Sequence, residues 1–231
     1  MLALILTTYV TVGIGFPSLI DPSAGADWLL FGIWTFMTLA MTWDVQVNRD
    51  AKLILTGLVG GLVIEWWGTN TELWRYYTDE RPPLWILPAW PIAALTIDRC
   101  GTLLDHLVPR LKDAAAAYWL IMPIFIAAMT RFLWPSIDEP ASWVVVALMI
   151  GVLFGKPQTG RDLTLFVAGS SLGIFLEYWG TSRRCWIYYT GQVPPPEAVL
   201  AHGFASVAFA RGVQLLDALI PTSSTAHPST E

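Results

Sequence analysis

Two glutamates of this chain have the residue type and surroundings for acid catalysis. Glu65 and Glu177 each lie at the end of a long apolar stretch, and each opens a segment rich in tryptophan, threonine and tyrosine. Ionisable residues inside apolar segments are costly and are usually functional. Removal from water favours the neutral carboxyl, which keeps a proton to donate. Such an acid can protonate an alkene, and aromatic faces can stabilise the resulting carbocation as they do other cations.

The surroundings of the two glutamates are repeated along with them. A shift of 112 positions places Arg49–Asp105 on Arg161–Asp217 without a gap, with 21 of 57 positions identical. Fixed spacing between a carboxylate, a threonine and several aromatics indicates either a specific site or a specific loop fold, and both interpretations stay open. The identical pairs include Glu65/Glu177, Trp67/Trp179, Gly68/Gly180, Thr69/Thr181, Trp74/Trp186, Tyr76/Tyr188 and Tyr77/Tyr189.

The repeat suggests roles for these residues. We expect Glu177 to be the proton donor and Glu65 to be the alternative acid or a counter-ion. His202 stands where the first copy has Trp90, and we expect it to act as a base or to orient Glu177. A histidine at the start of a helix is also often structural. The threonines would position the carboxyls or a water, and the aromatics would wall the substrate path. These expected substrate-binding residues are Thr69, Trp74, Tyr76, Tyr77, Thr181, Trp186, Tyr188, Tyr189, Trp67 and Trp179.

The composition is that of a polytopic membrane protein. Hydrophobic residues make up 55% of the chain, charged residues 13%, and the mean hydropathy is +0.53, whereas soluble domains carry about 25% charged residues. No segment alternates with period two as a membrane barrel requires, so we predict an all-α fold. About eight transmembrane helices are expected, at Leu2–Ile20, Trp28–Met41, Leu53–Trp67, Leu84–Ile97, Ala114–Trp134, Trp143–Phe154, Leu163–Trp179 and Val199–Ile220.

Eight spans would form two tandem four-helix repeats, at residues 1–110 and 111–220, related by pseudo-twofold symmetry. The Ser/Thr/Pro-rich segment 221–231 is expected to be a disordered tail. The side that holds the N-terminus would carry eight of the 13 Lys and Arg residues, which favours both termini in the cytoplasm.

An ionic cluster is expected at that same face. Asp50 and Glu65 would be about 22 Å apart along one helix, so Arg99 returns beside Asp50 and not beside the glutamate. We therefore expect Arg99 and its counterpart Arg211 to pair with aspartates, drawn from Asp50, Asp162, Asp105 and Asp217.

Several classes of function are disfavoured. A net charge of −5 without a basic run argues against nucleic acid. Cys100 and Cys185 form no metal pattern and do not occupy matching repeat positions. There is no Gly-rich phosphate loop and no Asp-rich pair for a metal-bound diphosphate. We expect no metal or cofactor. The expected partners are membrane lipids and a hydrophobic isoprenoid substrate taken from the bilayer.

The motif Glu65-x-x-Gly68-Thr69-x-Thr71-x-x-Trp74-x-Tyr76-Tyr77-Thr78, followed by Pro88-x-Trp90, resembles integral-membrane carotenoid hydratases. It is also distantly similar to the small, duplicated lycopene cyclases. The resemblance covers about 25 residues of each half, but Glu72 replaces a glycine of the hydratase motif, and the cyclases' paired-carboxylate motif is absent. It implies an enzyme that protonates a polyene double bond, so that the cation is then trapped by water or by ring closure.

Two other classes of function stay open. Duplicated repeats with membrane carboxylates also occur in proton-coupled transporters and channels. A membrane scaffold or assembly factor could use the aromatic loops to bind a partner protein.

Overall fold

The structure, a computed structural model, describes residues 2–15 and 25–219 of the 231-residue chain. It is helical apart from one pair of short strands, which confirms the predicted all-α class. Four helices, α3, α5, α7 and α8, are long and apolar enough to cross a membrane. The α-helices and strands of the described residues are α1 (Leu2–Gly15), α2 (Gly25–Thr42), α3 (Val47–Asn70), β1 (Trp74–Tyr76), α4 (Ala89–Leu107), α5 (Ala115–Phe132), α6 (Pro140–Phe154), α7 (Thr159–Ser182), β2 (Trp186–Tyr188) and α8 (Pro196–Leu219).

Most predicted spans match a helix within a few residues, and the fourth differs most. It was predicted to begin at Leu84, but Leu84–Ile86 forms a separate 3₁₀ turn and α4 begins at Ala89. Leu87 and Pro88 both keep helical backbone angles, so the break lies in the hydrogen bonding, because Pro88 has no N–H to donate to the preceding turn. The predicted tail at 221–231 and the end of the first predicted span lie outside the described residues.

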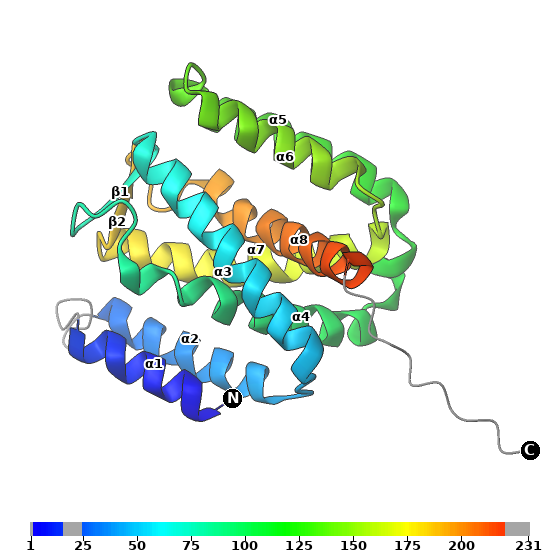
Figure 1. Cartoon of the computed structure of the whole chain (residues 1–231), viewed down its shortest axis with the longest axis horizontal. Coiled ribbons are helices and arrows are strands. Elements are labelled where there is room, and N and C mark those ends of the chain that lie inside the picture. Colours follow the sequence, from blue (N-terminus) through cyan, green and yellow to red (C-terminus); the bar gives the residue numbers. More distant parts are fainter. Residues whose placement is uncertain (1, 16–24, 220–231) are drawn as a thin grey trace, which may run out of the picture.

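Four helices form the centre of the molecule (Figure 1). α3 packs on α4, α7 packs on α8, and the two pairs contact each other through α4 with α7 and α3 with α8. The α1–α2 pair covers one side of this centre through α2, and the α5–α6 pair covers the opposite side. The predicted site residues therefore lie on central elements, between two outer helix pairs.

Glycines allow the closest helix approach, between α7 and α8. A Cβ atom at Gly169 would lie 2.7 Å from Gly203 Cα, and one at Gly203 would lie 2.3 Å from the Phe166 carbonyl oxygen. Small residues at such positions let two helices in an apolar environment gain dispersion contacts that larger side chains would prevent. This contact holds His202, the residue before Gly203, against α7.

The aromatic segments form a strand pair instead of the loop expected over Thr69–Pro83. β1 and β2 run antiparallel, with Trp74 opposite Tyr188 and Tyr76 opposite Trp186. The register is thus symmetric about the pair of Arg75 and Ile187. Positive φ angles also recur 112 residues apart, at Glu72 and Arg184 and again at Asp79 and Gly191. The sheet joins segments that are distant in sequence and brings their indoles and phenols together.

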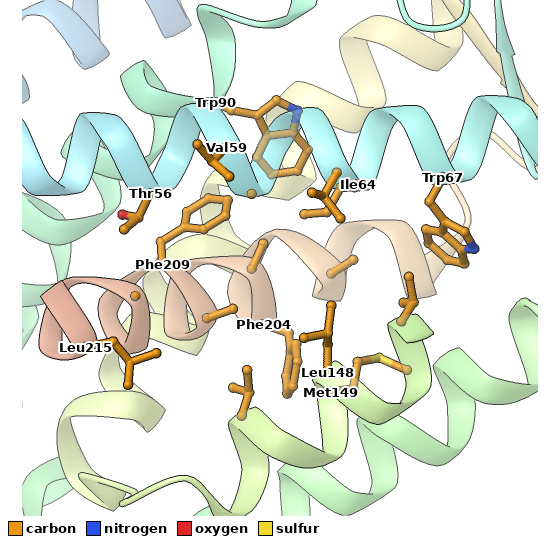
Figure 2. A pocket seen from close by; sticks show the side chains of 18 of the residues that line it. Thr56, Val59, Ile64, Trp67, Trp90, Leu148, Met149, Phe204, Phe209 and Leu215 are labelled. Atoms are coloured by element: carbon orange, nitrogen blue, oxygen red, sulfur yellow. The ribbon is translucent and has the colours of Figure 1, made fainter. Parts of the chain in front are cut away.

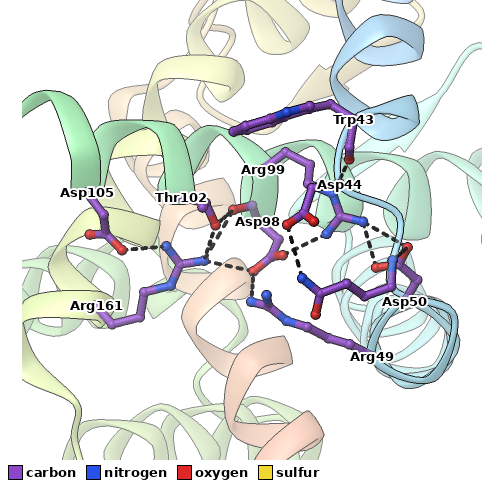
Figure 3. A network of polar contacts seen from close by, with 10 residues as sticks. Trp43, Asp44, Arg49, Asp50, Asp98, Arg99, Thr102, Asp105 and Arg161 are labelled. Atoms are coloured by element: carbon purple, nitrogen blue, oxygen red, sulfur yellow. Dashed lines mark hydrogen bonds and ion pairs between the residues drawn. The ribbon is translucent and has the colours of Figure 1, made fainter.

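The expected ionic cluster is present at the opposite end of the central helices (Figure 3). The buried Arg99 donates two hydrogen bonds to Asp50, at 2.7 and 2.8 Å, and one to Asp98 at 3.0 Å. Arg161 also donates to Asp98, at 2.8 Å. In the second half Arg211 pairs with Asp162. The prediction that Arg99 and Arg211 pair with aspartates of this set is confirmed.

Two other acids of that prediction have different partners. Asp105 accepts a hydrogen bond from Arg161 at 2.9 Å, and Asp217 pairs with Lys52. Asp98, which was not predicted to take part, joins Arg99 to Arg49 and Arg161. Since buried ion pairs need several partners to offset their lost hydration, a shared aspartate is a physically sound centre for this cluster.

Two tryptophans attach the outer helix pairs to the centre. Trp67 Nε1 donates to Ser142 Oγ of α6 at 3.1 Å, and Trp179 Nε1 donates to Asp27 Oδ1 of α2 at 3.0 Å. Arg183 Nε also donates to that Asp27 oxygen, at 2.9 Å. Trp67 and Trp179 were predicted to contact substrate, which stays a prediction, and their indole N–H groups bind neighbouring helices.

Candidate functional site

Glu65 is buried in the last turns of α3, with 4% of its surface exposed. Its Oε2 atom accepts hydrogen bonds from Trp74 Nε1 at 3.1 Å and from the Tyr76 hydroxyl at 2.6 Å. Its Oε1 atom accepts one from Trp90 Nε1 of α4 at 2.9 Å. Three donors satisfy this carboxyl without any water.

Gly68 explains why this motif needs a glycine. A Cβ atom at Gly68 would lie 1.8 Å from the Trp74 indole, so the ring lies directly over the helix backbone. Only a residue without a side chain permits this path, along which the indole N–H reaches Glu65 one turn earlier. Gly180 and Trp186 show the same arrangement, with a corresponding distance of 1.9 Å.

Glu177 occupies the matching place in α7 and is equally buried, with 4% exposed. Trp186 Nε1 donates to its Oε2 atom at 2.9 Å, and the Tyr188 hydroxyl lies 3.0 and 3.1 Å from its two oxygens. His202 Nε2 of α8 lies 3.0 Å from its Oε1 atom. The structure thus brings His202 to Glu177.

The two carboxyl groups face one small cavity between the central helices, called the carboxyl cavity below. Its volume is about 120 Å³, and both glutamates and both strands contribute to its wall. Trp90 and His202 stack there with ring centroids 5.5 Å apart and an interplanar angle of 17°. Both glutamates are therefore shielded from bulk water and face a common enclosed space.

The partners of the carboxyl oxygens distinguish the two glutamates. An indole N–H can only donate, whereas a tyrosine hydroxyl or a neutral imidazole can donate or accept. Glu65 Oε1 faces the indole of Trp90, and the Oε2 atom of each glutamate faces the indole of its own strand. Among the hydrogen bonds of the described residues, Glu177 Oε1 has Tyr188 and His202 as partners and no obligate donor. This oxygen can therefore carry a proton and donate it in a hydrogen bond.

The two strand tyrosines remain hydroxyl donors over a wide pH range. Burial raises the pKa of Tyr76 and of Tyr188 well above the ordinary value, and the neighbouring glutamates raise both further. The aromatic residues therefore act on the carboxyls first through their polar N–H and O–H groups. The sequence predicted a different role, in which the π faces stabilise a carbocation, and it did not predict these hydrogen bonds.

Four predicted substrate-binding residues lie away from the carboxyl oxygens. The hydroxyls of Thr69 and Thr181 each donate at 2.6 Å to the main-chain carbonyl of the glutamate four residues earlier, so they bind the helix backbone and do not orient the carboxyl. Tyr77 and Tyr189 are 40% and 46% exposed, and the Tyr189 hydroxyl donates to the Phe132 carbonyl at 2.7 Å.

The aromatics directly after the glutamates also point outward. Trp66 and Tyr178 are both 52% exposed and do not shield the carboxyls. Trp90 takes part of that role and was absent from the predicted site list. One signal for it was present in the sequence, because Trp90 and the predicted site residue His202 are matching positions of the repeat.

A larger apolar groove adjoins the carboxyl cavity (Figure 2). Its volume is about 560 Å³, and α3, α5, α6 and α8 line it almost entirely with apolar side chains. Trp67 lies at one end and Leu215 at the other. Leu148 and Leu215 are 55% and 65% exposed, so the groove opens to the outside of the bundle. It shares with the carboxyl cavity the lining residues Ile64, Trp67, Trp90, Met129 and Ala201.

A second apolar cavity of about 120 Å³ adjoins the carboxyl cavity from the side of α1 and α2. The residues that the two share include Leu176 and Ala89, which occupy the repeat positions of Ile64 and Ala201 in the large groove. The carboxyl cavity thus shares walls with apolar cavities on two sides.

The described residues contain no group of three His, Cys, Asp or Glu side chains that could hold a metal ion, and both cysteines are free thiols. Comparison with protein-family models, with curated proteins and with solved structures found no match to this chain.

Proposed function

We propose that the chain is a membrane enzyme that protonates a double bond of an isoprenoid hydrocarbon, leading to cyclisation or hydration. Glu177 donates the proton from its Oε1 atom. The carbocation is then quenched by water or by loss of a proton. The similarity of the Glu-x-x-Gly-Thr motif to carotenoid hydratases and lycopene cyclases agrees with this proposal and is a resemblance only.

One observation carries the proposal. Glu177 Oε1 is a buried carboxyl oxygen whose partners, Tyr188 and His202, are not obligate donors, so this oxygen can carry a proton. It lies in a cavity that shares part of its wall with an apolar groove of about 560 Å³, within the range of small-molecule sites. A buried acid beside apolar space suits an uncharged hydrocarbon, because such a substrate needs no polar recognition and can enter from lipid.

We further propose that all eight helices cross the membrane as two tandem four-helix repeats, with both termini in the cytoplasm. The repeated sequence, the symmetric strand register and the recurring positive φ angles support the repeat. The excess of Lys and Arg beside the ionic cluster supports the orientation.

Lipid extracts test the reaction. The chain is expressed in a host that makes isoprenoid hydrocarbons, and extracts are compared by mass spectrometry with and without it, in normal water and in D₂O. We expect a new product that carries one solvent deuterium on carbon. Glu177→Gln keeps the shape of the side chain and should remove this product while the protein stays folded. Unchanged product in both Glu177→Gln and Glu65→Gln would refute the proposal.

A further inference from the structure

One ring nitrogen of His202 takes no part in the contacts of the carboxyl groups. Its Nε2 atom lies 3.0 Å from Glu177 Oε1, whereas its Nδ1 atom is buried and has no hydrogen-bond partner in the part of the chain that the structure describes. The Nδ1 atom thus has no bonded partner, on a residue that forms part of the wall of the carboxyl cavity.

The hydrogen bonds indicate which nitrogen carries the proton at rest. A buried N–H without an acceptor loses its hydration without compensation, so a proton on Nδ1 is disfavoured. A proton on Nε2 points at Glu177 and is satisfied. His202 therefore donates through Nε2, and Trp90 at the matching position donates through its indole N–H. Unlike the indole, the imidazole also keeps a lone pair, on Nδ1.

We propose that His202 reloads Glu177 with protons through Nδ1, which makes the second half of the site the reactive one. This inference rests on the proposed function and deepens it. Glu177 gives its proton to the alkene, and quenching of the carbocation releases one proton. That proton passes through water to Nδ1 while the Nε2 proton moves to Glu177 Oε1, so the carboxyl is neutral again. The imidazole is left as its Nδ1–H form and returns to the Nε2–H form by exchanging its ring proton with water. No electrons are exchanged.

The surroundings support a transient positive charge on this ring. Trp90 lies parallel to it at 5.5 Å, and an indole face attracts a cation. The titratable groups that share the cavity with His202 are Glu65, Glu177, Tyr76 and Tyr188. Both glutamates favour the cation, and the two phenols keep their protons because burial raises the pKa of each.

Glu65 cannot receive a new proton by this route. Its partner on α4 is Trp90, whose indole holds its only N–H proton permanently. Glu65 is instead a fixed acceptor, suited to stabilise positive charge in the shared cavity. The difference between tryptophan and histidine at one repeat position thus gives two similar halves different roles in the proposed reaction.

Nitrogen NMR tests the histidine without any substrate. The chain has three histidines, so ¹⁵N-histidine labelling of the full protein gives few signals, and His202→Gln assigns the one of interest. We expect the Nε2–H form at high pH and proton uptake at Nδ1 on acidification. An Nδ1–H form at high pH, or no uptake at Nδ1 over the whole range in which the protein stays folded, would overturn the inference.

Turnover tests the relay itself. His202→Gln keeps an N–H donor for Glu177 but cannot carry a proton, and His202→Trp copies the other half. With acid-equilibrated protein we expect a burst near one product per site and a steady rate lower by about 10²-fold or more. A purely structural histidine would lower burst and steady rate together. Normal steady turnover in a folded His202→Gln protein would overturn the relay and leave the proposed function standing, whereas loss of product only in Glu177→Gln would support that function alone.

Discussion

Glu65 and Glu177 are held by the same three kinds of contact: an indole and a phenol from a strand, and a ring from the following helix. That helix supplies Trp90 in the first half and His202 in the second. The first half places an obligate donor at each carboxyl oxygen. The second half leaves one oxygen with partners that are not obligate donors. The comparison shows how two similar sites differ in hydrogen bonding through a single ring.

The ionic clusters of the two halves also differ, and this difference predicts the largest effect on stability. Arg99→Met leaves Asp50 buried without its partner and should cost about 3–5 kcal/mol. Arg211→Met should cost less, because Arg211 pairs with one aspartate where Arg99 contacts two and the Trp43 carbonyl. Reversible unfolding in detergent measures both losses. An equal or larger loss at Arg211 would contradict the comparison.

The phenol bonds to the glutamates give the second prediction. Tyr76→Phe should lower the free energy of unfolding by about 1.5–3 kcal/mol, because it removes a 2.6 Å hydrogen bond to a buried carboxyl. Tyr188→Phe should cost less, since its hydroxyl lies 3.0 and 3.1 Å from the two oxygens of Glu177. Chemical denaturation near neutral pH compares them. If Tyr188→Phe proved the more damaging variant, Tyr188 would be the stronger donor.

Replacement of the glycine beneath each tryptophan should lower the free energy of unfolding by a similar amount in both halves. Gly68→Ala and Gly180→Ala each place a methyl group inside an indole ring and should cost about 1–3 kcal/mol through forced repacking. Both should also change the near-UV circular dichroism of tryptophan. Gly151→Ala on α6 is the matched control, because its Cβ atom would meet nothing within 4 Å. Wild-type stability of the Gly68 variant would show that the indole can move aside.

The last expected effect is absent near neutral pH and appears only in alkali. Burial raises the pKa of Cys185 from 9.0 to about 12, so the folded protein keeps the thiol proton that the unfolded chain loses. The unfolded chain then binds fewer protons, and stability should fall as the pH rises from 9 to 12, by about 1.4 kcal/mol per unit at most for this group. Tyr76 and Tyr188 should add losses of the same sign above pH 10.

Cys185→Leu isolates the thiol contribution, because leucine is the residue at the matching position, Leu73. Its unfolding free energy should decline less steeply with pH than that of the wild type, as measured by denaturation at a series of alkaline pH values. Parallel curves for the two proteins would show that the thiol does not titrate differently on unfolding.

Much of this site follows from the residues alone. The repeat identified both glutamates, the glycine beneath each indole and the histidine that replaces Trp90, because local spacing along a helix determines which residues share a turn. The apolar segments predicted the helices, and the alternation of Arg and Asp with the return of the chain predicted the pairing of Arg99 with Asp50. These features depend on contacts that are near in sequence or that follow from antiparallel helices.

Only the tertiary structure decided which atoms meet. Three-residue strands with partners 112 positions away carry no local signal, so the pairing of Trp74 with Tyr188 was invisible in the sequence. The same holds for the direction of the rings, which turn N–H and O–H groups toward the glutamates, and for the binding of Trp179 to Asp27. A side chain's type limits what it can donate or accept, but its partner depends on how distant helices pack, and that packing is a property of the whole chain.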